Sequence, residues 1–333
     1  MAPKMRIGLV GLGRHMFEVL APCLRFMPEH ELVAVCDTDP ARVARFVATY
    51  TTATSYSDHA AMLAGEDLDA IILAVGHAQN FPIIRAALLA GVDVFVEKTP
   101  CASVAEAREL ARLQEESGRF VMVGFNRRYM TPYRMAKLLS LEPDFGPVVL
   151  FQSQFHAAPT RSEDFFIVNH VIHHLDLARY LLGEIDVAFA QRLKLDDSRL
   201  GMVVNFTARC GTIGTIQAAS TLHQSFPLER LELVGVGRNL VVEAGTELTY
   251  NRPVAQSTDN ARLPQLSGDS GSLSWKPNSA TYPVHAHHGF EQALMAFFEA
   301  IQTREAPQPD IADAVKTLEL VDAVMRCLEQ SVG

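Results

Sequence analysis

The chain has 333 residues, of which 48% are hydrophobic and 20% are charged, and it carries a net charge of −9 with a pI of about 5.7. This composition is typical of a globular protein long enough for two domains, and its acidic balance argues against nucleic-acid binding. The sequence contains neither a signal-peptide pattern nor an apolar run long enough to span a bilayer, so we expect a cytoplasmic protein without membrane contacts.

The five cysteines are scattered along the chain, at positions 23, 36, 101, 210 and 327. An odd number without paired spacing favours reduced thiols in a cytoplasmic protein over a disulfide framework or a zinc site. We therefore expect no disulfide and no bound metal.

Strand-like and helix-like segments alternate through the first third of the chain. The expected strands cover 5–10, 32–36, 70–75, 92–96 and 120–123, and the expected helices lie near 14–26, 40–48, 79–90 and 103–117. The last of these helices opens with a capping box from Ser103 to Glu106 and ends at Gly118. Repeated units of this kind predict a doubly wound parallel sheet.

The first strand is followed by a glycine-rich turn that opens the first helix, which is the context of a dinucleotide-binding fingerprint. Gly11 would permit the tight turn, and Gly13 would let the backbone approach a pyrophosphate at the helix N-terminus. Met16 stands at the third glycine position, so the fingerprint is incomplete. An ordinary strand-to-helix turn is the alternative. The candidate cofactor contacts from this turn are Gly8, Gly11, Leu12, Gly13, Arg14 and His15.

Asp37 ends the second expected strand and is followed by Thr38. A carboxylate at this position accepts hydrogen bonds from the adenosine ribose and repels a 2′-phosphate. Because no arginine immediately follows Asp37, we favour NAD over NADP. The alternative role of a helix N-cap suits Asp39, before Pro40, better. Together with the alternating strands and helices, the glycine-rich turn and Asp37 predict an α/β Rossmann domain over 1–124.

The strand at 92–96 runs into Glu97 and Lys98, and Pro100 ends it. Ligands of open α/β sheets bind at the carboxyl ends of the strands, so Lys98 is a candidate substrate-binding and catalytic residue. The alternative is an exposed ion pair, which is common and contributes little stability.

The pattern changes after Gly124. A helix is expected near 132–141, a strand over 148–155 and a long helix over 167–182, followed by mostly strand-like sequence at 185–250. Strands without intervening helices indicate an antiparallel sheet. Residues 251–286 are expected to form a long excursion, and the two last helices lie near 288–302 and 311–329. We therefore expect a second domain, 125–333, of the α+β class, with a large, mostly antiparallel, open-faced sheet.

With these features the chain resembles the Gfo/Idh/MocA oxidoreductase family over nearly its whole length. The strand-ending Glu-Lys-Pro of that family corresponds to Glu97, Lys98 and Thr99, which implies that Lys98 is the catalytic lysine and that Glu97 touches the cofactor or holds the lysine. Thr99 stands where the family usually has proline. The resemblance implies an NAD(P)-dependent dehydrogenase.

Two further segments take their expected roles from the same resemblance. The loop after the expected strand at 70–75 would lie along the cofactor, through Val75, Gly76 and Asn80. The segment 124–129 would reach the substrate and nicotinamide through Asn126 and Arg127, although a solvated turn is the alternative. Two arginines and an aromatic residue suit a hydroxylated or anionic ligand, and we add His156 as a further candidate substrate contact.

The third resemblance lies in the helix at 167–182. Aligned on its Asp-Leu-Ala-Arg tail, His173 takes the position of the catalytic histidine, and Asn169 replaces an aspartate. Positions four apart share one face of an α-helix, so both side chains are expected to reach one substrate. His170 and His174 are also four apart, but no third metal ligand is evident. We expect one of these histidines to serve packing or to support the residues that contact the substrate. The histidines at 285, 287 and 288 are expected to lie in a solvated loop.

The resulting hypothesis is NAD-dependent hydride transfer to or from a secondary alcohol of a sugar or polyol. His173 would act as general base and Lys98 would stabilise the oxygen, or the two roles are exchanged. Two alternatives remain open at this point: transient use of bound NAD in glycoside cleavage, and a non-enzymatic sensor. One face of the antiparallel sheet is expected to form a homodimer or homotetramer interface.

Overall fold

The computed structural model describes residues 4–25, 27–28, 30–50, 53–223, 227–253, 271–277 and 288–330. The chain divides into two compact units. Unit 1 comprises Met1–Tyr129 and Val284–Glu319, and unit 2 comprises Met130–Pro283 and Leu320–Gly333. The first boundary therefore lies at 129/130 and not at the expected 124/125. In addition, Val284–Glu319, which was expected in the second domain, belongs to the first unit.

Unit 1 contains a six-stranded sheet in which each described pair of neighbouring strands is parallel. The strands, in spatial order, are β3 (Thr54–Tyr56), β2 (His30–Cys36), β1 (Met5–Val10), β4 (Ala70–Leu73), β5 (Asp93–Glu97) and β6 (Val121–Gly124). Every residue of β4 and β5 is buried, including the charged Asp93 and Glu97 at the ends of β5, as expected for a sheet covered on both faces. The strand order reverses between β1 and β4, where doubly wound sheets open a ligand crevice.

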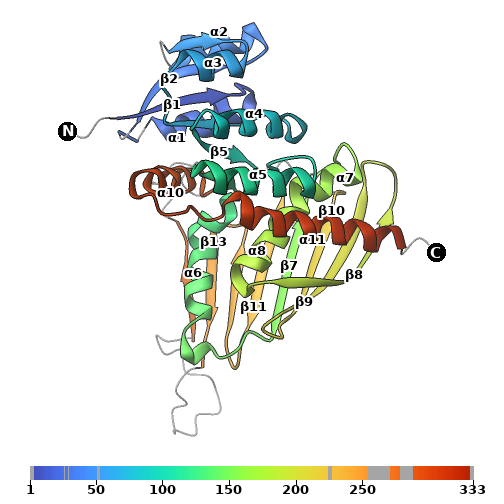
Figure 1. Cartoon of the computed structure of the whole chain (residues 1–333). Helices are drawn as coiled ribbons and strands as arrows, with labels where there is room; N and C mark the ends of the chain where they lie inside the picture. The colour runs from blue at the N-terminus through green and yellow to red at the C-terminus, as the bar shows by residue number, and fades with distance from the viewer. Residues whose placement is uncertain are drawn as a thin grey trace, which may run out of the picture. The chain divides into compact units, whose positions relative to one another are not determined.

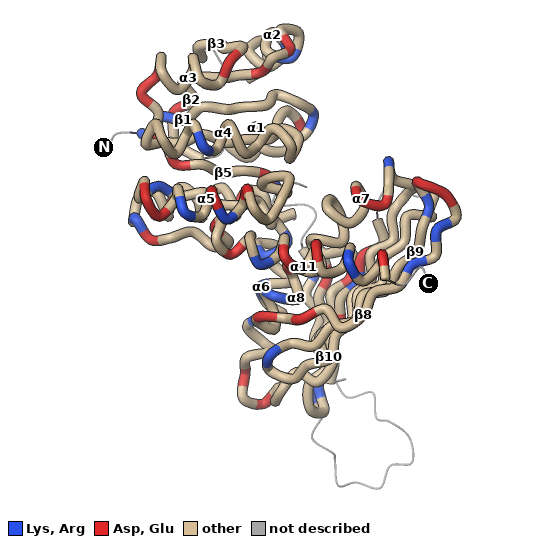
Figure 2. The backbone as a smooth tube through the Cα atoms, turned by 45° about the vertical axis from the view of Figure 1, so that its right-hand side comes forward, with Lys and Arg blue, Asp and Glu red and all other residues tan. Residues whose placement is uncertain are grey.

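Most helices of unit 1 connect these strands, while η2 follows the last strand and α10 comes from near the C-terminus (Figure 1). They are η1 (Met16–Leu20), α1 (Ala21–Leu24), α2 (Pro40–Tyr50), α3 (His59–Gly65), α4 (His77–Leu89), α5 (Val104–Ser117), η2 (Asn126–Tyr129) and α10 (Phe290–Thr303). The predicted caps of α5 are confirmed: Ser103 Oγ accepts from Glu106 N at 3.2 Å, and Gly118 has a positive φ of 63°. Acidic and basic residues alternate along the exposed side of α5 (Figure 2).

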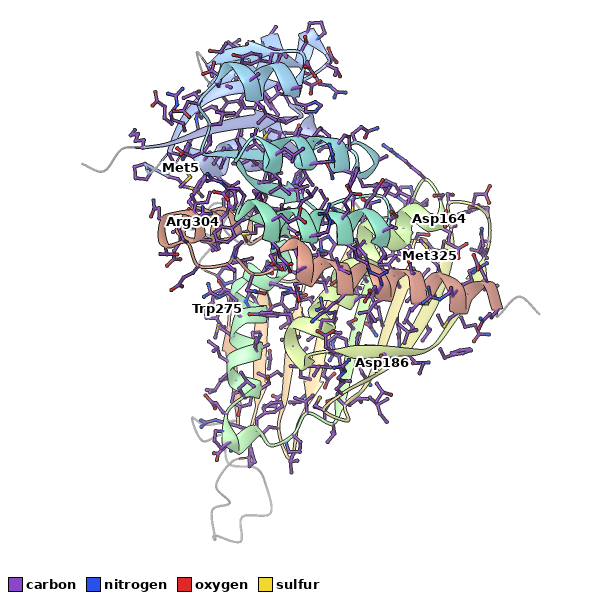
Figure 3. All side chains as sticks on the ribbon, viewed as in Figure 1. Met5, Asp164, Asp186, Trp275, Arg304 and Met325 are labelled. Carbon is purple, nitrogen blue, oxygen red and sulfur yellow. The ribbon has the colours of Figure 1, made fainter. Side chains whose placement is uncertain are left out.

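The C-terminal segment joins unit 1 through its core and through Arg304. Phe297 of α10 packs beside Phe95 of β5, with ring centroids 5.8 Å apart, in the cluster that also contains Leu9. Arg304, labelled in Figure 3, donates to Asp93 Oδ2 at 2.9 Å and to the Gly118 carbonyl at 2.7 Å. Because Asp93 is buried, the guanidinium supplies a countercharge that ties this segment to the sheet.

Unit 2 contains an eight-stranded sheet that is antiparallel except for the β7–β10 pair. The strands, in spatial order, are β14 (Ser272–Trp275), β13 (Glu247–Asn251), β12 (Asn239–Glu243), β11 (Leu228–Val234), β7 (Leu150–His156), β10 (Ile213–Ala219), β9 (Leu200–Ala208) and β8 (Ile185–Lys194). The predicted large antiparallel sheet is confirmed. β14 falls within the expected excursion at 251–286, and 254–270 and 278–287 lie outside the described residues.

One face of this sheet carries helices. α6 (Thr131–Ser140) contacts β12 and β13, and α8 (Ile172–Leu182) contacts β8 and β10, as Figure 1 also shows. Between α6 and α8 the chain forms η3 (Pro143–Phe145), α7 (Glu163–Phe166) and η4 (Ile167–Val171). In β9 buried and partly or fully exposed residues alternate, as in a sheet with one covered face. The last helix, α11 (Ile311–Gln330), continues across the division between the units.

No helix in the described ranges is both long and apolar enough to cross a membrane.

Candidate functional site

The glycine-rich turn between β1 and η1 uses its two glycines differently. Gly11 has a φ of +86°, and a Cβ there would lie 2.4 Å from Val75 Cγ1 and 2.6 Å from the Ala74 carbonyl oxygen. Only glycine fits this position. A Cβ on Gly13 would meet only Arg42 Nη1, at 4.0 Å, so space is open above its backbone. That open space is what the close approach of a pyrophosphate requires.

The carboxylate of Asp37 fixes this turn to the end of β2. Its Oδ2 accepts from the backbone N–H of Leu12 at 2.7 Å, and its Oδ1 accepts from the N–H of Asp39 at 2.9 Å. Each oxygen retains a lone pair that can accept a further hydrogen bond. Asp37 is thus held rigidly by the backbone, with acceptor capacity left for a ribose hydroxyl.

Arg42, in the first turn of α2, was missed by the sequence reasoning. Its Nη1 lies 3.7 Å from Asp37 Oδ2, and its Nε lies 3.3 Å from Asp39 Oδ2. The available signal was the i,i+3 spacing of Asp39 and Arg42 on a predicted helix, which places both on one face. The end of β2 therefore carries a cation as well as the predicted acid.

A cavity of about 580 Å³ within unit 1 joins these features, and its size suits a small-molecule ligand. Eight predicted cofactor contacts line it: Gly11, Gly13, Arg14, His15, Asp37, Thr38, Val75 and Gly76. It also includes Arg42 and His59, which were not predicted. Gly8 and Leu12 do not line the cavity; a Cβ on Gly8 would lie 3.1 Å from Met62 and Leu68, so Gly8 serves packing.

His15 and Glu97 face each other at the end of β5. His15 Nε2 lies 3.3 Å from Glu97 Oε1, and both atoms are buried without a hydrogen-bond partner in the described part of the chain. A Cβ on Gly124 would lie 3.1 Å from the same Glu97 oxygen, so the carboxylate packs closely against the Gly124 backbone, where there is no side chain. A ligand amide, such as the nicotinamide carboxamide, offers the N–H donor that such an oxygen lacks.

Lys98 follows Glu97 and is partly buried. Burial lowers the pKa of its ammonium from 10.5 to about 8, because the charged form loses water; the Glu97 carboxylate raises the pKa, and the Arg127 guanidinium lowers it further. The peptide bond between Lys98 and Thr99 is cis. Because Glu97 is buried, the pair is not the exposed ion pair considered as the alternative.

Asn80 supports the bend after Lys98. It is buried in α4, and its Nδ2 donates to the Thr99 carbonyl oxygen at 2.9 Å. The residue predicted to contact the cofactor therefore holds the backbone beside the lysine, and it does not line the cavity.

The segment 124–129 is an ordered part of unit 1, and the alternative of a solvated turn is wrong. Asn126 Nδ2 donates to the His288 carbonyl oxygen at 2.8 Å, and Arg128 Nη2 donates to Asp313 Oδ2 at 2.7 Å. Both residues are buried. Arg127 is the member of this segment whose charge acts on Lys98.

In unit 2 the predicted continuous helix at 167–182 is interrupted. Residues Ile167–Val171 form a π-helix, and α8 begins only at Ile172. Asn169 Nδ2 donates to the Phe165 carbonyl oxygen at 3.1 Å, and His173 is 5% exposed. Asn169 therefore lies in the π-helical turn, and His173 lies in the α-helix that follows it. π-helical turns occur frequently at functional sites.

Two other histidines of this unit, His170 and His174, pack against an aromatic ring. The rings of His170 and His174 lie 5.2 and 5.4 Å from the ring of Phe155. Among the described residues, no group of three or more His, Cys, Asp or Glu side chains is arranged to hold a metal ion. His156, the last residue of β7, is partly buried. The positions 285 and 287 lie outside the described residues.

Comparisons with known proteins agree with this architecture. Residues 5–125 match the sequence profile of an oxidoreductase family with an NAD-binding Rossmann fold, GFO_IDH_MocA. The chain is similar to an inositol 2-dehydrogenase of Pseudomonas fluorescens, at 28% identity over 98% of this chain and 94% of that protein. It is also similar to a D-apiose dehydrogenase of Paraburkholderia graminis, at 25% identity over 88% of this chain and 80% of that protein.

A solved structure extends the likeness in fold to both units. The crystal structure of a dehydrogenase from Chromobacterium violaceum has a TM-score of 0.88 at 22% identity and covers 99% of this chain and 97% of that chain. The profile covers the strands and glycine turn of unit 1, and the relatives named above continue the sequence similarity through unit 2. Residues 5–125 therefore match the NAD-binding Rossmann domain of the Gfo/Idh/MocA oxidoreductase family, and the relatives that span both units are dehydrogenases.

Proposed function

We propose that this enzyme transfers hydride reversibly between NAD and a secondary alcohol of a sugar, polyol or related compound. The observation that carries the proposal is the cavity in which open space above Gly13 and the carboxylate of Asp37 lie together. Support for the substrate class comes from the relatives, which are an inositol 2-dehydrogenase and a D-apiose dehydrogenase.

The chain offers suitable partners for each part of the cofactor. The turn at Gly13 would receive the pyrophosphate, Asp37 would accept from the adenosine ribose, and Glu97 would accept from the carboxamide. Thr38, Val75 and Gly76 would line the remaining surface. Bound NAD would supply the hydride acceptor for alcohol oxidation.

Lys98 and His173 would handle the substrate hydroxyl. Its proton must leave as the carbon–hydrogen bond breaks, and the imidazole of His173 is a side chain of the kind that most often accepts such a proton in enzymes. Lys98, protonated below pH about 8, would donate a hydrogen bond to the oxygen as negative charge develops on it. In the opposite assignment, neutral Lys98 acts as the base and accepts the hydroxyl proton, so the proton is also accounted for.

The remaining predicted substrate contacts have positioning roles in this proposal. Asn169 would orient the hydroxyl or the imidazole through its Oδ1, since its Nδ2 is committed to Phe165. Asn126, Arg127 and His156 would hold the rest of the substrate. A basic residue in this set suits a sugar acid as well as a neutral polyol.

A panel of sugars, polyols and sugar acids tests the reaction class directly. The purified enzyme is incubated with NAD and each compound, and released NADH is followed by its absorbance. Appearance of NADH with at least one compound supports the proposal. Cleavage of glycosides without net NADH would replace it with transient use of bound NAD, and binding without turnover of any compound would replace it with a sensor.

We also propose that the enzyme is a cytoplasmic homodimer or homotetramer. The sheet of unit 2 exposes the large apolar side chains Val203, Ile213 and Leu228, and such residues are frequent in subunit interfaces. Light scattering at micromolar concentration should give a mass of two or four chains. A monomer under these conditions would contradict this part of the proposal.

A further inference from the structure

The 3-10 turn η2 is tied to a segment from near the C-terminus by an ion pair and a hydrogen bond. Arg128 Nη2 donates to Asp313 Oδ2 at 2.7 Å, and the Tyr129 hydroxyl donates to the Gln308 carbonyl oxygen. The side chain of Arg128 is 9% exposed and that of Asp313 is 20% exposed, so solvent screens this ion pair much less than a surface pair. One short stretch of chain, 308–313, therefore restrains the turn.

The Asp313 carboxylate stands on a rigid support. The N–H of Asp313 donates to Asp310 Oδ1 at 2.8 Å, as in an N-cap of the first turn of α11. The other carboxylate oxygen of Asp310 accepts from Gln114 Nε2 of α5 at 2.9 Å, and the Pro309 carbonyl oxygen accepts from the N–H of Val123 in β6 at 3.0 Å. The first turn of α11 is therefore fixed to α5 and to the sheet independently of η2, and Asp313 can serve as an anchor.

The ion pair of Arg128 influences the direction in which its neighbour Arg127 points. A 3-10 helix has three residues per turn, so successive side chains leave its axis about 120° apart. With Arg128 directed to Asp313, Arg127 leaves η2 on another side. The pKa of Lys98 is lowered to about 8, first by burial and further by the charge of Arg127. Arg127 is therefore directed to the neighbourhood of Lys98.

Loss of the Asp313 carboxylate would remove the countercharge of a buried guanidinium. A buried charge without its countercharge is strongly unfavourable, and a turn as short as η2 relieves this cost by rearranging. Because Arg127 is the direct neighbour of Arg128 in the chain, such a rearrangement would carry the Arg127 guanidinium away from Lys98.

We propose that Asp313 is a positioning residue that acts through Arg128 and holds η2 in the conformation in which Arg127 is directed toward Lys98 and the substrate. This inference rests on the proposed function, in which Arg127 holds part of the substrate. It gives the first turn of α11 a role in the reaction, although Asp313 itself touches neither substrate nor cofactor.

Competitive labelling of Lys98 tests the inference without any substrate. The full chain is treated with acetic anhydride at a series of pH values, and mass spectrometry measures the acetylation of Lys98. Only the neutral amine reacts, so the midpoint of the labelling curve reports the pKa of Lys98, and the plateau at high pH reports the access of the reagent.

The variants are Asp313→Asn, Asp313→Glu, Arg127→Gln and the double variant Arg127→Gln/Asp313→Asn. Glu319→Gln is the matched control. Glu319 lies on the same helix, α11, and also forms an ion pair, but its partner is Arg108 of α5, at 2.6 Å.

Asp313→Asn should move the Lys98 midpoint to higher pH, as Arg127→Gln does, because Lys98 loses the influence of the nearby guanidinium. Near the wild-type midpoint, the labelling rate relative to the plateau should fall by about twofold or more. In the Arg127→Gln background, Asp313→Asn should move the midpoint no further, since its effect passes through Arg127. Asp313→Glu should restore part of the wild-type midpoint, and Glu319→Gln should leave it unchanged.

The direction of the shift separates positioning from a direct charge effect. Removal of a carboxylate that acted on Lys98 through space would lower the pKa of the ammonium, which is the opposite direction. A midpoint that moves to lower pH, or does not move, in a folded Asp313→Asn variant would overturn the inference. If Asp313→Asn does not fold, the variant Arg128→Gln/Asp313→Asn, which leaves no charge at this ion pair, should show the expected shift, and an unchanged midpoint there would overturn the inference.

Steady-state kinetics with the best compound of the panel give a second readout. In Asp313→Asn, KM for the compound should rise by about fivefold or more, and KM for NAD should stay within about twofold of wild type. Because labelling needs no substrate, the two failures are distinguishable. Absence of NADH with every compound would overturn the proposed function, whereas a Lys98 midpoint that does not respond to Asp313→Asn would overturn this inference.

Discussion

The side-chain amide of Asn80 donates a 2.9 Å hydrogen bond to the Thr99 carbonyl oxygen, so α4 holds the bend that directly follows Lys98. Asn80→Leu preserves most of the volume but removes the donor. We expect kcat to fall by about tenfold to a hundredfold with little change in KM for NAD, because small misplacements of a reacting group are costly. Steady-state kinetics check this, and thermal unfolding should show a loss of about 1–3 kcal/mol for the unmade bond.

Arg85→Ala is the matched control, since Arg85 lies on the exposed side of the same helix and pairs only loosely with Glu109, at 3.8 Å. It should leave kcat unchanged. If Asn80→Leu keeps the wild-type kcat, Asn80 does not position Lys98.

The pKa of Lys98 predicts opposite effects for its two charged neighbours. Glu97 raises this pKa and Arg127 lowers it, around a value of about 8. Glu97→Gln should therefore move the limb of the pH profile of kcat/KM that Lys98 governs to lower pH, and Arg127→Gln should move it to higher pH. The direction of each shift is the same whether activity falls or rises as Lys98 loses its proton.

The profiles should be measured from pH 6 to 10 at several substrate concentrations, so that kcat/KM reports the free enzyme. Arg134→Gln, outside unit 1 and absent from the causes of the Lys98 shift, is the control. Shifts of the same sign in Glu97→Gln and Arg127→Gln would contradict the assignment of this limb to Lys98.

The two glycines of the turn should respond differently to alanine. Gly11→Ala meets backbone at 2.6 Å and a positive φ, so we expect a loss of stability of several kcal/mol. Gly13→Ala meets nothing closer than 4.0 Å, so its stability should stay within about 0.5 kcal/mol of wild type, while its affinity for NADH should drop by about tenfold or more.

Thermal unfolding and NADH titration of both variants check this prediction. Normal NADH affinity in a folded Gly13→Ala variant would show that the pyrophosphate does not approach this backbone.

Much of the fold was predictable because its signals are local. The alternation of apolar strands with capped helices predicted the parallel sheet, and Gly118 marked the end of α5. β3, Thr54–Tyr56, was missed because it is only three residues long and lacks an apolar run. The N-cap Asp58, which accepts from Ala61 N at 3.0 Å, was the available signal for the missed helix α3.

Other features depend on contacts between distant segments and leave no local pattern. The assignment of α10 to unit 1 follows from the packing of Phe297 on Phe95. The cis peptide bond before Thr99 could not be predicted from the sequence, because the residue that follows it is not proline. The π-helical turn at Asn169 is indistinguishable from an α-helix by apolar spacing over so few residues. The sequence therefore predicted which residues belong to the candidate site better than it predicted the contacts that each of these residues makes.

The central claim is that Lys98 and His173 act on the hydroxyl of an alcohol that passes hydride to NAD. The most direct measurement is the rate of NADH formation by wild type, Lys98→Ala, His173→Ala and the double variant, with the best compound from the panel. We predict a loss of about a hundredfold or more in each single variant and a double variant that loses much less than the product of the two. Near-wild-type rates in both single variants, or no NADH from any compound, would contradict the account.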